Sequence, residues 1–170
     1  MPSHTTVTAA LLALLLALIP FDSSRASAHT SPESTTEDVR VGSLPGTGTW
    51  MNVPGAFKVL SNDSFSITAG KATDFYNNVD DGGRVANAPM LLFPADSTFV
   101  LTAAVRVDFK KEFDGGFFVV YADQDHWLKL LFEKSHYGPY SVCSNVTNVG
   151  VDDTVNADVA GPEVYLRLTR

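Results

Sequence analysis

Three side chains of one short segment, Trp127, Lys129 and Glu133, have the chemistry of a sugar-binding surface. An aromatic ring covers the apolar face of a pyranose, and polar groups hydrogen-bond its hydroxyls. Asp74 and Tyr76 belong to an earlier segment whose loop is expected to approach the same surface. Trp127 equally suits a packing role at the start of a strand, because tryptophan is so often buried. Both interpretations of Trp127 stay open at this point.

Catalysis on this surface would need a second acid. Glycoside hydrolysis uses two carboxylates about 5–10 Å apart on either side of the scissile bond. The alternate positions before Glu133 hold Leu131 and Lys129, so the paired geometry is missing. The sequence also contains no zinc-binding set, no serine-nucleophile elbow and no phosphate-binding loop. We therefore predict no catalytic residues.

Two acidic turns carry oxygen ligands that would suit Ca²⁺. Asp123 and Asp125 form a D-x-D turn, and Asp80 and Asp81 precede two glycines. Turn chemistry explains both pairs without a metal. We predict no metal site and no cofactor, with calcium as the open alternative.

The sugar-binding candidates lie on a predicted β-hairpin, Phe113 to Glu133, in which two apolar runs flank a polar turn. If the loop is Asp123 to His126, Ala122 lies opposite Trp127, and this register fixes both faces. The predicted core face carries Phe117, Val119, Tyr121, Leu128, Leu130 and Phe132. The opposite face carries Phe118, Val120, Ala122, Trp127, Lys129, Leu131 and Glu133.

The remaining elements are also predicted to be strands. They span 57–60, 65–69, 73–76, 90–93, 99–108, 140–146 and 164–168. The longest alternation is 99–108, and nowhere do apolar residues persist at helical spacing for three turns after the N-terminal segment. We predict an all-β fold, an antiparallel sandwich or barrel.

The N-terminus has the pattern of a secretory signal peptide. An apolar run from Val7 to Ile19 is too short to span a bilayer comfortably, and Ala26-Ser27-Ala28 suits a signal peptidase. We predict a signal peptide over 1–28, a disordered Ser/Thr/Pro-rich linker over 29–48 and a folded domain over 49–170. The protein is expected to be secreted, with no membrane association after cleavage.

The net charge excludes two classes of binding partner, and the cysteine count excludes a disulfide. The formal net charge of -7 argues against nucleic acids and anionic membrane surfaces, and we exclude both. Cys143 is the only cysteine, which rules out an intramolecular disulfide and favours a small buried hydrophobic residue. Asn62 and Asn145 begin N-glycosylation sequons, of which Asn62 lies in a turn.

Several spaced motifs together resemble a known family. They are W-x-N-x-P from Trp50, T-D-F from Thr73, and Y-x-D-x-x-x-W-x-K-x-x-x-E from Tyr121 to Glu133. Asp114-Gly115-Gly116 and Ser141 to Asn145 extend the resemblance, which covers roughly 50–170. The chain is similar to the domain of unknown function typified by the regulation-of-enolase protein, in the concanavalin A-like lectin/glucanase superfamily.

The resemblance implies a jelly-roll sandwich of two curved sheets. Members of the superfamily often bind or cleave carbohydrate on the concave sheet. The carboxylate pattern of the glucanase branch, Glu-x-Asp-x-Glu, is absent here. The family domain usually continues past a strand like 164–168 into closing strands, so we expect this sandwich to lack its C-terminal closing strands.

We expect a secreted lectin-like module that binds a glycan or polysaccharide through Trp127, Lys129, Glu133, Asp74 and Tyr76. One alternative is a non-catalytic protein-interaction or structural sandwich. Another is a glycoside hydrolase.

Overall fold

A computed structural model describes residues 6–9, 13–15, 34–78, 83–136 and 138–170. These residues form strands and turns and no helix, which confirms the all-β prediction. The described residues therefore offer no long apolar helix that would cross a membrane. The strands are β1 Thr6–Ala9, β2 Ala13–Leu15, β3 Ser34–Val39, β4 Gly48–Met51, β5 Ala56–Ser61, β6 Ser64–Thr68, β7 Phe75–Asn77, β8 Arg84–Ala86, β9 Met90–Pro94, β10 Val100–Val107, β11 Gly115–Tyr121, β12 His126–Lys134, β13 Tyr140–Asn148, β14 Gly150–Val159 and β15 Glu163–Thr169.

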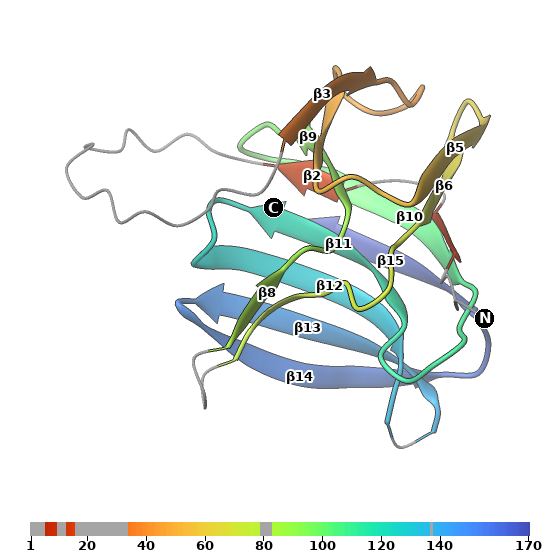
Figure 1. Ribbon diagram of the computed structural model, residues 1–170, viewed down its shortest axis with the longest axis vertical. Coiled ribbons are helices and arrows are strands. Elements are labelled where there is room, and N and C mark those ends of the chain that lie inside the picture. The colour runs from red at the N-terminus through yellow and green to blue at the C-terminus, as the bar shows by residue number, and fades with distance from the viewer. Residues whose placement is uncertain (1–5, 10–12, 16–33, 79–82, 137) are drawn as a thin grey trace.

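The strands assemble into three sheets (Figure 1). A 5-stranded sheet has the order β15-β10-β1-β6-β5, and an 8-stranded sheet has the order β14-β13-β12-β11-β2-β9-β4-β3. The third sheet is the pair β7-β8. Neighbouring strands run antiparallel, except that β2 is parallel to both β9 and β11.

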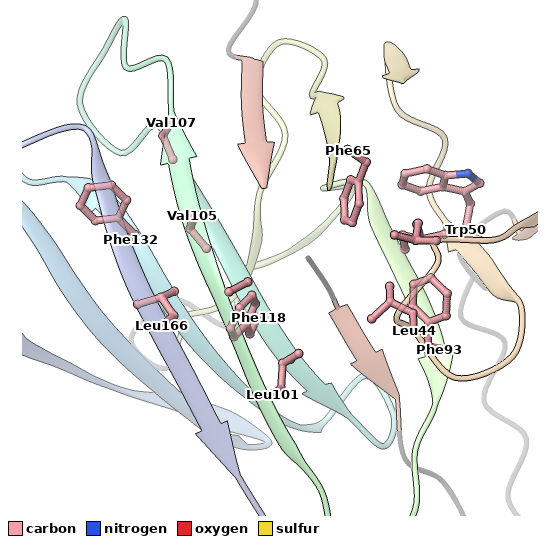
Figure 2. Packing of buried hydrophobic residues seen from close by; sticks show 13 residues of the cluster. Leu44, Trp50, Phe65, Phe93, Leu101, Val105, Val107, Phe118, Phe132 and Leu166 are labelled. Carbon is pink, nitrogen blue, oxygen red and sulfur yellow. The ribbon is translucent and has the colours of Figure 1, made fainter. Parts of the chain in front are cut away.

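The main core lies between the two larger sheets. β10 contributes Leu101, Val105 and Val107 from one side, because alternate residues of a strand point to the same face. Phe118 of β11 and Phe132 of β12 meet them from the other sheet. Figure 2 shows these side chains between the strands, with Phe65, Phe93, Trp50 and Leu44 at the other end of the cluster.

A second, smaller core lies on the opposite face of the 8-stranded sheet. Phe75 of β7 packs there against Val119, Tyr121 and Trp127. The strand β9 contributes to both cores, since Leu91 and Phe93 face the first and Met90 and Leu92 face the second. The β7-β8 pair therefore covers part of the outer face of the larger sheet and leaves the rest of that face open to a site.

The register of the β11-β12 hairpin differs from the prediction by one residue. The N–H groups of Ala122 and Asp123 both donate to the carbonyl of His126, at 3.0 and 3.3 Å. Two residues thus oppose one, which is a β-bulge, and Tyr121 rather than Ala122 pairs with Trp127. The predicted faces are correct for β12 and wrong for β11. Phe117, Val119 and Tyr121 share a face with Trp127, Lys129 and Glu133, while Phe118 and Val120 face the main core.

The N-terminal segments also contain strands. Residues 34–39 form β3, which pairs with β4, and Val41 and Leu44 are buried in the main core. These residues fall in the predicted disordered linker over 29–48, of which 29–33 lie outside the described residues, and the division into signal peptide, linker and domain stays a prediction. β1 and β2 fall within the predicted signal peptide, whose cleavage site after Ala28 lies outside the described residues.

Candidate functional site

The open part of the outer face is built from three neighbouring strands, β12, β13 and β14. Lys129 pairs with Asn145, and Asn145 pairs with Asp153, so these three side chains form one row across the sheet. Glu133 pairs with Ser141 in a second row. Polar side chains are thus concentrated on one face, where an ordinary sheet core would place apolar ones.

Lys129 is buried in this face. Its Nζ donates to the carbonyl oxygen of Phe75 at 2.9 Å and lies 5.5 Å from the ring centroid of Phe117 and 5.7 Å from that of Trp127. Burial lowers the pKa of Lys129, against the opposing effect of nearby Asp74, Glu133 and Asp153. The cation is held by one carbonyl and two aromatic rings, an arrangement that fixes it in place.

Glu133 and Cys143 form a coupled pair beside Lys129. The Cys143 thiol donates to Oε1 of Glu133 at 3.4 Å. Burial raises the pKa of Glu133 above its ordinary value, although the hydrogen bond from Cys143 acts the other way. Burial and the nearby Glu133 carboxylate raise the pKa of Cys143 to about 12. Cys143 is buried as predicted, and it pairs with Leu131 of β12.

Asn145 is a deeply buried polar residue of the site, at 2% exposure. Its Nδ2 donates to the carboxylate of Asp153, and its Oδ1 has no partner among the described residues. A buried acceptor without a donor costs about 1–3 kcal/mol, so this oxygen is a marked feature. Of the two predicted sequon asparagines, Asn145 is therefore buried, whereas Asn62 lies exposed between β5 and β6.

Trp127 lies under the β7-β8 pair, with only 4% of its surface exposed. Its ring centroid is 4.7 Å from that of Phe75, and its Nε1 has no hydrogen-bond partner among the described residues. The packing role that the sequence left open for Trp127 is the one that this geometry supports.

Asp74 and Tyr76 approach the site from the opposite side, as expected for their loop. The N–H of Asp74 donates to Oδ1 of Asn87 at 2.8 Å, and the N–H groups of Asn87 and Ala88 both donate to the Asp74 carbonyl at 3.0 Å. These bonds anchor the start of β7. Both side chains then line the same pocket as Lys129 and Glu133.

That pocket has a volume of about 830 Å³, within the usual range for small-molecule sites. Its polar wall is Asp74, Lys129, Glu133, Asn145 and Asp153. The apolar floor of the pocket reaches the main core and is formed by Phe65, Leu91, Val105, Phe117 and Phe118. Its rim includes the loop residues Lys111, Phe113 and Asp114.

The acidic turn considered for calcium is occupied by protein partners. The Asp123 carboxylate accepts the N–H of Asp125 at 2.8 Å and contacts Nδ1 of His126 at 2.8 Å. Asp125 forms an ion pair with Arg84. The described residues contain no group of three or more His, Cys, Asp or Glu side chains that would hold a metal ion. Asp80 and Asp81 lie outside the described residues.

Sequence reasoning missed three residues of the pocket. Asn145 was noted for its sequon and for the family resemblance but not as a binding residue. Phe117 was assigned to the core by the shifted register, and Asp153 lies in a polar stretch that was not predicted to be a strand. Asp152, Asp153 and Thr154 are consecutive polar residues, so the sequence of β14 lacks the apolar-polar alternation that signals a strand.

Comparison with known families assigns the chain. The family described as a protein of unknown function, DUF1349, matches residues 50–170. The chain belongs to this family. Every residue that lines the pocket lies within the matched range, so the site is part of the DUF1349 domain.

A solved structure extends the comparison. The DUF1349 chain is similar to the crystal structure of a functionally unknown protein from Saccharomyces cerevisiae, with a TM-score of 0.64 and 25% sequence identity. The match covers 72% of this chain and 66% of that chain, so this chain spans just under two thirds of the yeast protein's length. No curated protein matches the DUF1349 chain in sequence.

Proposed function

We propose that this DUF1349 domain is a carbohydrate-binding module and that the pocket between β7 and β12–β14 holds one sugar residue of a glycan. The observation that carries the proposal is Oδ1 of Asn145, a deeply buried acceptor without a donor, on the wall of the pocket. A ligand hydroxyl would supply the missing donor. The neighbouring carboxylates of Glu133 and Asp153 accept further hydroxyls, as polyol recognition requires.

The two-sided lining of the pocket supports a sugar over a fully polar ligand. A pyranose has an apolar face of C–H groups and an equatorial belt of hydroxyls. The aromatic ring of Phe117 and the apolar floor suit the C–H face of the sugar. The row of Lys129, Asn145 and Asp153 suits its hydroxyls. Phe117 thereby takes the contact role that the sequence gave to Trp127.

The proposal also covers the fold type of the two sheets and the cellular location of the protein. We propose that the two facing sheets are a jelly roll of the concanavalin A-like lectin/glucanase type, and that the protein is secreted through the segment 1–28. The alternatives are a protein-interaction or structural sandwich and a glycoside hydrolase. The raised pKa of Glu133 is the observation that favours the hydrolase, since a general acid needs a proton at neutral pH.

A glycan array with the full chain, followed by calorimetric titration of the hits, tests the binding proposal. Asp153→Asn removes a carboxylate from the pocket wall, and we expect it to weaken binding about tenfold. Asp152→Asn is the matched control, because Asp152 pairs with Val146 and faces away from the pocket. Binding by neither the wild type nor the control would reject the proposal, and equal binding by all three proteins would reject the site.

Hydrolysis is tested separately by release of reducing sugar from polysaccharides that bind. We expect no release. Release that disappears in Glu133→Gln would replace the binding-module proposal with the hydrolase.

A further inference from the structure

The loop before β11 holds a large aromatic residue in a conformation that disfavours it. Phe113 has a φ of 63°, in the left-handed region, and its side chain is 66% exposed. A bulky side chain in this region is a steric outlier, and glycine would adopt the conformation at no cost. Packing does not explain the ring, because most of its surface is exposed to solvent.

Hydrogen bonds hold Phe113 in this conformation. Its N–H donates to the carbonyl of Lys134 at 2.8 Å, and the N–H of Lys134 donates to the carbonyl of Asp114 at 3.0 Å. The Asp114 carboxylate accepts the N–H groups of Lys110 and Lys111, at 2.8 and 2.7 Å. The turn is therefore tied to β12, and the ring projects from a fixed base. Strained residues of this kind are typical of binding sites.

The position of the ring relates it to the pocket. Phe113 is one of the rim residues, next to Asp114 and Gly115, which also line the pocket. The ring lies parallel to that of His136, with an interplanar angle of 5° and centroids 6.1 Å apart. His136 thus lies against one face of the Phe113 ring, beside the pocket mouth, and most of the Phe113 side chain remains exposed.

We propose that Phe113 is the aromatic platform of a second sugar subsite, so that the ligand is an oligosaccharide of at least two residues. This inference rests on the proposed function of the pocket. One sugar residue occupies the polar pocket, and the next stacks its apolar face on the Phe113 ring outside it. The stacking contact offsets the backbone strain that Phe113 introduces.

The test separates strain from binding by using a matched pair of glycine variants. Val149 also has a positive φ, 71°, and is 63% exposed, but it lies in the β13–β14 turn and does not line the pocket. Phe113→Gly and Val149→Gly both place glycine where the backbone is left-handed, which removes the steric strain of the original side chain. We therefore expect neither variant to lower the melting temperature. Phe113→Tyr keeps the aromatic face and serves as the rescue variant.

Titration calorimetry with a monosaccharide and its oligomers then gives the result. We expect wild type, Val149→Gly and Phe113→Tyr to bind the disaccharide about tenfold more tightly than the monosaccharide, and Phe113→Gly to lose this gain. An unchanged gain in Phe113→Gly would overturn the second subsite while the pocket proposal stands. Absence of any saccharide binding by the wild type would overturn both.

Discussion

The thiol of Cys143 donates a hydrogen bond of 3.4 Å to the carboxylate of Glu133 on the adjacent strand. Burial disfavours the charged form of both groups, and the Glu133 carboxylate further disfavours the Cys143 thiolate, whereas the hydrogen bond from the thiol favours the Glu133 carboxylate. The pair therefore carries at most one negative charge near neutral pH. Two predictions depend on this coupling.

The first prediction concerns the reactivity of Cys143. The thiolate is the reactive species, and a pKa of about 12 leaves almost none of it at pH 8. We expect a thiol-specific reagent to modify the native protein more than about a hundredfold more slowly than the protein in guanidinium chloride. Absorbance of the released chromophore measures both rates. Rapid labelling without denaturant would contradict the buried, protonated thiol.

The second prediction concerns stability and pH. The pKa of Glu133 is raised on folding, so between the ordinary carboxyl pKa and the raised one the native state binds more protons than the unfolded state. Stability from this group is greatest below the ordinary pKa and falls as pH rises through the raised value. We expect Glu133→Gln to have a higher melting temperature than the wild type at pH 7.

Thermal unfolding across pH 4 to 7 checks the sign of this effect. The advantage of Glu133→Gln should shrink toward pH 4, since the wild-type carboxyl is then protonated in both states. If the melting temperature of Glu133→Gln, measured relative to the wild type, rises as the pH falls, the ionised carboxylate stabilises the fold through Lys129 instead.

The third prediction distinguishes the two sequons. In a host that glycosylates, Ser64→Ala should abolish the glycan-dependent mobility shift, because Asn62 lies exposed in a turn. Thr147→Val removes the other sequon and should leave the shift unchanged. It should also keep the melting temperature, since Oγ1 of Thr147 has no partner among the described residues. A second glycan on folded, secreted protein would contradict the burial of Asn145.

The fourth prediction concerns β1 and β2. β1 lies between β6 and β10, and β2 lies between β9 and β11, so each is an internal strand of its sheet. Deletion of residues 1–28 would leave backbone groups unpaired on four strands, at about 1–3 kcal/mol for each group that is not rehydrated. Because we propose that 1–28 is a secretion signal, we expect the deletion variant to keep a cooperative thermal transition, at a lower melting temperature than the full chain. Loss of the transition would show that β1 and β2 belong to the folded protein and would contradict the signal-peptide proposal.

Local patterns predicted most of the fold. The alternation over 99–108 corresponds to β10 with Leu101, Ala103, Val105 and Val107 buried, because one face of that strand meets the core. The predicted hairpin of 57–60 and 65–69 corresponds to β5 and β6. In both cases the apolar-polar pattern that predicts the strand lies within one or two neighbouring strands. The sequence of those strands alone is therefore enough to predict them.

The site depended on features that are not local. The bulge at Ala122 and Asp123 shifts β11 by one residue, and no composition rule places such a bulge. Trp127 is covered because β7, which lies far away in sequence, packs across it. Asn77 has a similar long-range role, since its Nδ2 donates to the carbonyls of Gln124 and Val149 at 3.0 and 3.2 Å.

The internal position of β1 also bears on the order of folding. Val7 pairs with both Ile67 and Val107, so β1 finds its partners only after the later strands β6 and β10 have been synthesised. Pairings of such long sequence separation are slow to form, because a large loop must close first. A chain whose N-terminus is held by an export machinery would complete neither large sheet, and it would remain open enough for translocation until that end is released.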